Sequence, residues 1–182
     1  MSKKEVLEMK IGIFGGSFNP PHKMHHQIAT ALIQKRYVDK VIFVPTGNLY
    51  PYKNHLASDQ DRLKMLQLMI QNEKNMEVDA FELKDKVVYT YQTLRYFKKK
   101  YPKDHIYFLL GTDNLNYIDQ WKQGDELLKN YDFLIIKRHT DPLLPLLEKY
   151  ADYQGHFILT DIKESSISST KIREMIYNNK AY

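Results

Sequence analysis

Short apolar runs alternate with amphipathic stretches along this chain of 182 residues, and no other feature constrains its fold as much. Several of these runs are continuously apolar, which is typical of parallel strands that helices cover on both faces. We expect strands at Lys10–Phe14, Lys40–Val44, Met76–Phe81, His105–Leu110, Tyr131–Ile136 and His156–Leu159. Strands that alternate with helices predict an α/β fold, with a doubly wound, mainly parallel sheet and helices on both faces.

Helix signals fill the segments between the expected strands. Two apolar stripes have helical spacing, one of Ile28, Ala31 and Leu32 and one of Leu63, Leu66 and Ile70. Three N-caps are expected: Ser58, with Asp61 three residues on as in a capping box, Thr90 before a helix over 91–100, and Ser168 or Ser169 before a helix over 170–178. A further helix is expected at Leu143–Tyr150, with Pro145 in its first turn. Ligands of such folds bind where the strands end, which makes the loops at 15–22, 45–55, 111–121 and 160–170 the informative ones.

Composition narrows the class of protein. The 27 Lys and Arg residues exceed the 22 Asp and Glu residues, and the net charge of +5 suits an anionic ligand but is too small to indicate nucleic acid binding. The sequence has no cysteine, which excludes disulfides, thiolate metal sites and cysteine nucleophiles. No apolar run approaches the roughly 20 residues of a membrane span, and no apolar stretch follows the first lysines as in a signal peptide. We therefore expect one cytoplasmic domain over residues 1–182, with residues 1–8 as a flexible extension.

The segment Gly15–His22, with the sequence GGSFNPPH, follows the first expected strand and precedes a helix. Two glycines let the backbone approach a ligand closely, and the N–H groups of a helix start favour phosphate. His22 and His25 share one face of a helical turn, where protonated imidazoles would hold phosphate oxygens and stabilise charge during group transfer. Two partly exposed histidines with no role are the alternative. The spacing also permits a metal site, but no carboxylate or third ligand lies nearby in the sequence.

The segment around residues 168–170 offers a second set of phosphate ligands. Its Ser and Thr hydroxyls lie at an expected helix start, and Arg173 follows one turn later, a combination that suits a triphosphate tail. The plainer alternative is a serine-capped surface helix with Ile172 and Ile176 packed inward.

Two motifs carry a resemblance to a known superfamily. Gly15–His25 reads GGSFNPPHKMH and resembles the GGxFxPxHxGH motif of the nucleotidyltransferase superfamily, while Ile167–Arg173 reads ISSTKIR and matches its second signature, ISSTxIR. Two motifs far apart in the chain, each at an expected strand-to-helix junction, are much more specific than either alone. Met24 stands where the superfamily has glycine, and its side chain would obstruct a close approach to phosphate unless it points into the core or away from the ligand.

The middle of the chain resembles one branch of this superfamily, the bacterial nicotinate-mononucleotide adenylyltransferases. Residues 111–128 are similar to their GxDxLxxLxxWxxxxxLL stretch, residues 88–94 resemble SYTxDTL with Gln92 in place of the acidic residue, and residues 51–53 resemble PHK with Tyr52 in place of histidine. The resemblance covers nearly all of residues 10–178. It implies a Rossmann-like fold and an enzyme of NAD biosynthesis that transfers the adenylyl group of ATP to nicotinate mononucleotide, with Mg²⁺ carried by ATP.

The resemblance also implies roles for single residues. His22 and His25 are the expected catalytic residues, and no protein ligand to a metal is expected. The expected ATP-binding residues are Gly15, Gly16, Ser17, Phe18, His22, His25, Gly111, Asp113, Ser169, Thr170 and Arg173, and the expected substrate-binding residues are Lys53, Tyr89, Thr90, Trp121 and Arg138. Several have a plainer reading: Trp121 as partial core packing, Thr90 and Asp113 as helix caps, and Lys53 and Arg138 as solvated charges.

Other functions stay open on the sequence alone. The same fold carries cytidylyltransferases and pantetheine-phosphate adenylyltransferases, although the latter usually have threonine at the position of His22. A catalytically silent protein that binds a nucleotide or RNA is a third alternative, and Met24 is the feature that favours it. The run Lys98–Lys100 is expected to be a solvated helix end rather than a nucleic acid patch. The expected partners are ATP and nicotinate mononucleotide, with no membrane and no nucleic acid. A homo-oligomer is expected only because many soluble enzymes form one. The sequence does not distinguish nicotinate mononucleotide from nicotinamide mononucleotide as the acceptor.

Overall fold

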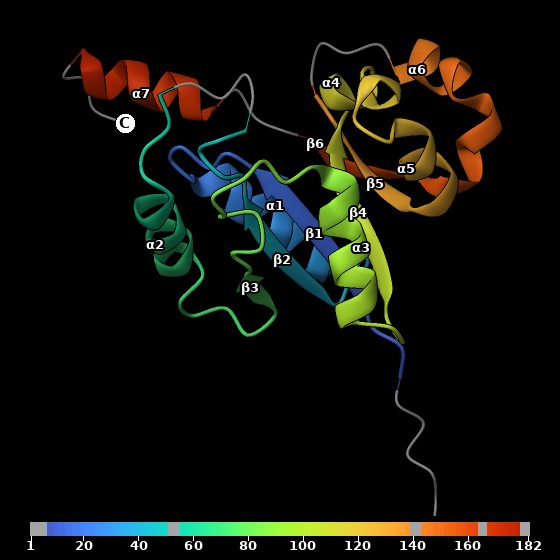
Figure 1. Cartoon of the computed structure of the whole chain (residues 1–182), viewed down its shortest axis with the longest axis horizontal. Coiled ribbons are helices and arrows are strands. Elements are labelled where there is room, and N and C mark those ends of the chain that lie inside the picture. Colours follow the sequence, from blue (N-terminus) through green and yellow to red (C-terminus); the bar gives the residue numbers. More distant parts are fainter. Residues whose placement is uncertain (1–6, 51–54, 139–142, 164–166, 179–182) are drawn as a thin grey trace, which may run out of the picture.

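A computed structural model describes residues 7–50, 55–138, 143–163 and 167–178. In this part of the chain six strands form one sheet in the order β3-β2-β1-β4-β5-β6, and every neighbouring pair is parallel (Figure 1). The strands are β1 (Lys10–Gly16), β2 (Lys40–Pro45), β3 (Met76–Val78), β4 (His105–Gly111), β5 (Asp132–Lys137) and β6 (Phe157–Lys163). The expected Rossmann-like, doubly wound α/β fold is therefore confirmed.

Helices connect the strands and cover both faces of the sheet. The α-helices are α1 (Lys23–Gln34), α2 (Asp59–Met69), α3 (Thr90–Lys100), α4 (Thr112–Leu115), α5 (Gly124–Asn130), α6 (Leu143–Lys149) and α7 (Ser169–Tyr177), and the 3₁₀ helices are η1 (Ile118–Gln120) and η2 (Ala151–His156). Figure 1 shows α1 behind the sheet and α3 in front of it. Among the described residues, no helix is both long enough and apolar enough to span a membrane.

Two apolar clusters hold the layers together. Phe108 and Phe133 belong to the cluster that includes side chains of α3 and α5, whereas the next residues, Leu109 and Leu134, belong to the cluster that includes side chains of α1 and α2. Successive side chains of a strand point to opposite faces, so a strand buried on both faces must be apolar at every position. This packing explains the continuous apolar runs of the sequence.

The strands lie where they are expected, with differences at their ends. β3 stops at Val78 rather than Phe81, because the N–H of Asp79 donates to the carbonyl of Phe43 and the Asp79 side chain then accepts the N–H of Phe81, which turns the chain away from the sheet. β5 begins one residue later than expected. β6 continues beyond Leu159, because its pairing with β5 resumes after an irregularity and joins Lys137 to Lys163.

Helix starts were predicted with mixed success. Ser58 is confirmed as an N-cap, since its Oγ accepts the N–H of Asp61 at 3.1 Å, and Ser168 is confirmed in the same role for α7. Thr90 as an N-cap was wrong: Tyr89 is the N-cap of α3, and Thr90 is the first helical residue. Segment 111–121, expected as a loop, contains the short helices α4 and η1.

Two expected apolar faces differ from the sequence pattern. On α2 the fully buried residues are Arg62 and Leu66, while Leu63 is only half-buried. On α7 no residue is buried, so the serine-capped surface helix is confirmed, but Ile172 is only half-buried and Ile176 is 50% exposed, so the expected inward packing of Ile176 was wrong.

The order of the strands fixes where a ligand fits. It runs β3-β2-β1 in one direction and β4-β5-β6 in the other, so the direction of winding changes between β1 and β4. The crevice outside the carboxyl ends of two such strands is the usual ligand site of doubly wound sheets. The loop after β1 and the short helix after β4 border this crevice.

Candidate active site

The loop after β1 is held in a conformation that few side chains adopt. Phe18 has a φ of +46°, in the left-handed region, where a bulky residue is strained. Its ring is 2% exposed and packs edge-on against Phe14, Phe43 and His25, with centroids 5.6, 5.6 and 4.9 Å away. A Cβ on Gly16 would come within 3.2 Å of the same ring, so glycine there leaves room for it. Burial of the Phe18 ring thus helps to fix the turn of this loop.

The two histidines of the first motif lie against one another at the start of α1. Their ring centroids are 3.8 Å apart, and the rings are tilted by 32°. The backbone N–H of His22, the N-cap residue, donates to Nδ1 of His25 at 3.0 Å. Because Nδ1 of His25 accepts this bond, a neutral His25 carries its proton on Nε2 and offers that N–H as a donor.

The charge state of the pair differs from the sequence-based expectation of protonated imidazoles. Burial, followed by the neighbouring His22 and Arg138, lowers the pKa of His25 from 6.5 to about 3. Burial also lowers the pKa of His22. His25 is therefore a neutral hydrogen-bond donor at pH 7. Nδ1 of His22 is buried and has no hydrogen-bond partner among the described residues.

The start of α7 is bound to the loop after β1. Ser169 Oγ donates to the carbonyl of Pro20 at 2.8 Å, and Arg173 Nη1 donates to the carbonyl of Asn19 at 2.5 Å. The Arg173 guanidinium also donates to Thr170 Oγ1 at 3.2 Å. The two signature segments, which lie at opposite ends of the chain, therefore form one surface beside the histidine pair.

Three further expected residues gather at the end of β4. Arg138 Nη1 and Asp113 Oδ2 form an ion pair at 3.0 Å, and both side chains are partly exposed. A Cβ on Gly111 would lie 2.5 Å from Asp113 Oδ1, so the close return of this carboxylate requires glycine. Asp113 Oδ1 is buried and has no hydrogen-bond partner among the described residues. The charge of Arg138 also contributes to the lowered pKa of His25, after burial and His22.

A cavity of about 220 Å³ opens between β1 and β4. It is lined by Gly15, Gly16, Thr46, Tyr50, Glu82, Val88, Thr90, Phe108, Leu109, Leu110, Asn114 and Trp121. We call it the switch-point cavity. Trp121, half-buried, meets Phe108 edge-on with centroids 6.5 Å apart, so one part of its indole packs on the core while another part lines the cavity. Thr90 contributes the first turn of α3 to the same wall.

Not every expected substrate-binding residue lines the switch-point cavity. Tyr89 is outside its lining, and the Tyr89 N–H donates to Oε1 of Gln92 at 2.9 Å, so that donor is engaged within the start of α3. Arg138 lies with Asp113 instead. Lys53 falls outside the described residues.

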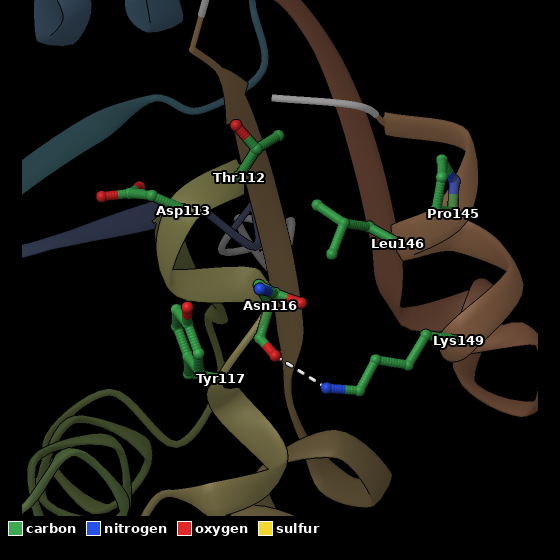
Figure 2. Close-up of a pocket in the computed structure, with 7 residues that line it drawn as sticks. All are labelled: Thr112, Asp113, Asn116, Tyr117, Pro145, Leu146 and Lys149. Carbon is green, nitrogen blue, oxygen red and sulfur yellow. Dashed lines mark hydrogen bonds between the residues drawn. The ribbon is translucent and has the colours of Figure 1, made fainter. Parts of the chain in front are cut away.

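A second cavity of about 280 Å³ lies between α4 and α6 (Figure 2). It is lined by Thr112, Asp113, Asn116, Tyr117, Pro145, Leu146 and Lys149. Lys149 spans it and donates to the carbonyl of Asn116 at 2.7 Å and to Asp119 at 3.1 Å. Two successive residues of α4 thus line different cavities: Asp113 lines this one, and Asn114 lines the switch-point cavity.

Met24, the departure from the first motif, packs against the apolar cluster of α1 and α2. Its side chain therefore points into the core and does not obstruct the approach of a phosphate to the loop.

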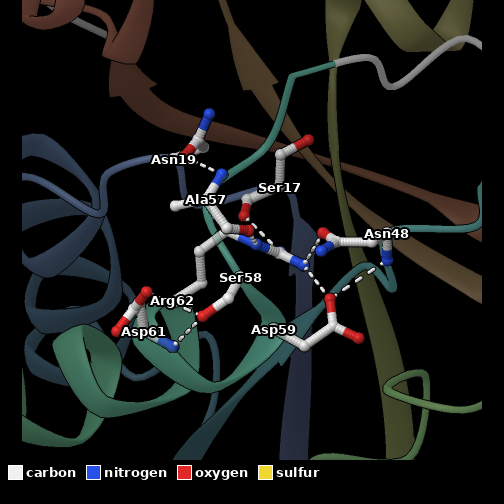
Figure 3. Close-up of polar contacts among 8 residues, drawn as sticks. All are labelled: Ser17, Asn19, Asn48, Ala57, Ser58, Asp59, Asp61 and Arg62. Carbon is white, nitrogen blue, oxygen red and sulfur yellow. Dashed lines mark hydrogen bonds and ion pairs between the residues drawn. The ribbon is translucent and has the colours of Figure 1, made fainter.

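Sequence reasoning missed Arg62, a guanidinium at the centre of a polar network (Figure 3). It is 0% exposed and donates to two backbone carbonyls and two side chains of three different segments: Ser17 O, Ala57 O, Asn48 Oδ1 and Asp59 Oδ1. The sequence did hold a signal for its burial: Arg62 lies one turn before Leu66 and two turns before Ile70, on the same face of the helix as these apolar residues. Thr46, Tyr50 and Glu82, which line the switch-point cavity, were not singled out either.

The residues described here contain no group of three or more His, Asp or Glu side chains placed to hold a metal ion.

Comparison with known proteins places the chain among nucleotidyltransferases. The model of the cytidylyltransferase-like family matches residues 13–175. A probable nicotinate-nucleotide adenylyltransferase of Caldicellulosiruptor saccharolyticus is 38% identical over 178 residues, which are 95% of this chain and 89% of that protein. The nicotinate-nucleotide adenylyltransferase of Bacillus subtilis is 32% identical over 177 residues, 94% of this chain and 87% of that protein.

A solved structure has the same fold. The nicotinic acid mononucleotide adenylyltransferase of Plasmodium falciparum, complexed with NaAD, superimposes with a TM-score of 0.81 and 23% sequence identity. The match covers 96% of this chain and 87% of that one.

Proposed function

The chain belongs to the cytidylyltransferase-like family, among the nicotinate-nucleotide adenylyltransferases, and we propose that it transfers the adenylyl group of ATP to nicotinate mononucleotide. The products are nicotinate adenine dinucleotide and pyrophosphate, a step of NAD biosynthesis. Membership of the family supports nucleotidyl transfer as the type of reaction. The names of the relatives support nicotinate mononucleotide as the acceptor.

One observation supports this function most directly: Ser169 and Arg173 of α7 are bonded to the loop after β1, beside His25. A triphosphate needs donors along its whole length, and this arrangement joins a helix start, an arginine and two imidazoles on one surface. The adjoining switch-point cavity then gives the second substrate a place within reach of the same surface.

In the proposed reaction, a phosphate oxygen of the mononucleotide attacks the α-phosphorus of ATP. One P–O bond forms, the bond from the α-phosphorus to the oxygen that bridges to the β-phosphorus breaks, and pyrophosphate leaves with that oxygen and its electron pair. No protein nucleophile takes part. The protein contributes alignment of the two substrates and donors for the charge that builds up on the phosphoryl oxygens.

His22 and His25 are the proposed catalytic residues. His25 offers a fixed Nε2–H donor, because its Nδ1 is already bonded to the backbone of His22. An anionic phosphate beside the pair would favour protonation of either ring and so strengthen its hydrogen bonds in the transition state. The ATP tail would also contact the backbone of Gly15–Phe18 and the side chains of Ser169, Thr170 and Arg173.

The nucleoside part of ATP is assigned to Gly111 and Asp113. The partly exposed Asp113 carboxylate would accept a ribose hydroxyl, and its ion pair with Arg138 holds it in place. Arg138 itself is proposed to contact a phosphate between the two substrates, because it lies near His25 and not in the wall of the switch-point cavity.

The pyridine ring of the acceptor is assigned to the switch-point cavity. Trp121 offers an aromatic face there, and the first turn of α3 at Thr90 offers backbone donors and the positive end of a helix dipole to the ring carboxylate. The Tyr89 N–H is not proposed as a donor to the ring carboxylate, because it already donates to Gln92; Tyr89 contributes as the residue that begins this turn.

Magnesium is proposed to arrive bound to the phosphates of ATP. Its chemistry there is to neutralise charge on the phosphoryl oxygens and on the leaving pyrophosphate. Because no group of three or more His, Asp or Glu side chains in the described part of the chain is placed to hold a metal ion, we assign no protein ligand to magnesium.

The proposal is tested by pyrophosphate release with ATP and Mg²⁺ and a panel of acceptors. The panel contains nicotinate mononucleotide, nicotinamide mononucleotide, pantetheine phosphate and choline phosphate with CTP. We expect release with nicotinate mononucleotide at a kcat/KM at least tenfold above the other acceptors. Release only with pantetheine phosphate or only with CTP would replace this function by another of the same fold, and a folded protein that binds ATP without release would be a nucleotide-binding protein instead.

A further inference from the structure

We propose that Arg62 is a positioning residue, which holds the phosphate-binding loop after β1 in its reactive conformation. This inference rests on the proposed function. Arg62 touches neither the cavities nor the histidine pair, and it would act through the backbone of that loop.

The guanidinium of Arg62 is buried between segments that lie far apart in the sequence. Arg62 is on α2 and is 0% exposed, yet it donates to Ser17 O at 2.7 Å across the boundary of two segments far apart in the sequence. Its remaining donors reach Ala57 O at 3.1 Å, Asn48 Oδ1 at 3.0 Å and Asp59 Oδ1 at 2.6 Å (Figure 3). A buried arginine is tolerated only when its charge and donors are satisfied, and here the carboxylate of Asp59 and three other oxygens satisfy them.

Arg62 holds the peptide between Ser17 and Phe18. The carbonyl of Ser17 points to Arg62, and in a trans peptide the following N–H, that of Phe18, points in the opposite direction. Phe18 is the residue with the strained φ of +46°. A strained residue persists only where its surroundings hold it, and the bond from Arg62 holds the peptide directly before it.

The loop after β1 is bound from two sides. Asn19 accepts the N–H of Ala57 on its side chain and a bond from Arg173 on its backbone carbonyl. On the α2 side Arg62 is 0% exposed, whereas Arg173 is exposed on a helix without a buried residue. We infer that Arg62 forms the fixed side of the loop against which α7 and the phosphates are placed.

The network also joins the two halves of the proposed site. Asn48, a partner of Arg62, lies between Thr46 and Tyr50, which line the switch-point cavity. Arg62 therefore links the loop assigned to ATP with the segment assigned to the acceptor, and its loss should disturb their relative alignment more than the affinity for either substrate.

The experiment compares Arg62→Lys with Leu66→Ala in the full-length protein. Lysine keeps a positive charge but lacks the planar fork, so it cannot serve Ser17, Ala57 and Asp59 together. Leu66 is fully buried one turn later on α2 and belongs to the apolar cluster that also contains Phe18, so Leu66→Ala destabilises the same helix and the same cluster without removing a hydrogen bond to the loop. Assays are run at a temperature where circular dichroism shows each variant folded.

We expect Arg62→Lys to lower kcat about 10- to 100-fold with KM for both substrates changed less than about threefold, the result of misalignment. Hydrogen exchange of the amides of residues 16–19 should become faster in Arg62→Lys than in Leu66→Ala. An Arg62→Lys protein with kcat within twofold of wild type, or with loop exchange equal to that of Leu66→Ala, would overturn the proposal. An equal loss of kcat in Leu66→Ala would overturn it as well.

A milder variant covers the case in which Arg62→Lys does not fold. Asp59→Asn keeps Arg62 and removes only the charge that holds its Nη2, and we expect a smaller fall in kcat with the same faster exchange at residues 16–19. Hydrogen exchange needs no turnover, so it tests the positioning role even if the wild type transfers no adenylyl group. Unchanged exchange in Asp59→Asn would count against the proposal.

Discussion

The backbone N–H of His22 donates to Nδ1 of His25 at 3.0 Å, while the two rings lie 3.8 Å apart. This bond determines which nitrogen of His25 carries its proton and so leaves Nε2–H as the donor for a ligand. The hydrogen bond by which the His25 side chain caps the helix thus also fixes which of its nitrogens can donate to the proposed substrate.

The first prediction concerns His25. Its replacement by alanine removes a proposed transition-state donor, so we expect His25→Ala to lower kcat about 100- to 1,000-fold, as removal of such donors does in other enzymes. The dissociation constant for ATP, measured by calorimetry, should change by less than about fivefold. The matched control is His26→Ala, because His26 pairs with Glu73 at 2.7 Å and stands outside the proposed site. Equal turnover in His25→Ala and His26→Ala would contradict the assigned role.

The second prediction is a pH dependence of stability. The pKa of His25 is about 3 in the folded protein and near 6.5 when the chain is unfolded, so protonation favours the unfolded state. The contribution is complete above about pH 6.5 and is lost progressively as the pH falls toward 3. We therefore expect the Tm difference between pH 7.5 and pH 5 to be smaller in His25→Gln than in wild type.

The control for this titration is His55→Asn, which removes an exposed histidine and suits its φ of +60°. It should keep the pH dependence of the wild type. Parallel Tm curves for wild type and His25→Gln would show that His25 is not held neutral by burial.

The third prediction concerns the ion pair of Asp113 and Arg138. Both side chains are partly exposed, so the pair contributes at most about 1 kcal/mol to stability. Asp113→Ala should therefore leave the Tm within a few degrees of wild type but raise KM for ATP about tenfold, because a ribose contact is lost. Asp161→Ala, which removes the exposed pair of Lys35 and Asp161, is the control and should leave KM for ATP unchanged. A KM for ATP unaffected by Asp113→Ala would remove this residue from the ATP site.

The fourth prediction uses Trp121, the single tryptophan of the chain. If a pyridine ring enters the switch-point cavity, Trp121 fluorescence should change on addition of nicotinate mononucleotide and not on addition of ATP alone. Trp121→Leu should raise KM for the mononucleotide about tenfold, in the range of aromatic stacking on a base. Calorimetric binding of the mononucleotide without any change in emission would place the ring elsewhere.

Much of the fold could be predicted, because the continuous apolar runs follow directly from burial of the strands on both faces. Strand ends were less predictable, since Asp79 turns the chain by a side-chain bond that depends on β2 lying alongside. The bonds of Ser169 and Arg173 to Pro20 and Asn19 join opposite ends of the chain, and no local pattern specifies them.

The motifs pointed to the segments that the structure brings together, but the tertiary contacts of the candidate site could not be predicted. Arg62 lies on the inward stripe of its helix, but a buried arginine could not be expected there without its four oxygen partners, two of which, Ser17 O and Asn48 Oδ1, come from other segments. The neutral state of His25 could not be predicted from spacing, because it results from burial and from the approach of Arg138.

The most direct test of the account follows the α-phosphorus of ATP. The wild-type protein is incubated with nicotinate mononucleotide, Mg²⁺ and ATP labelled at the α-phosphate, and the products are separated by chromatography. The account predicts that the label appears in nicotinate adenine dinucleotide, with one pyrophosphate released for each dinucleotide formed. Label that appears only in free AMP, or that stays in ATP while the folded protein binds both substrates, would contradict it.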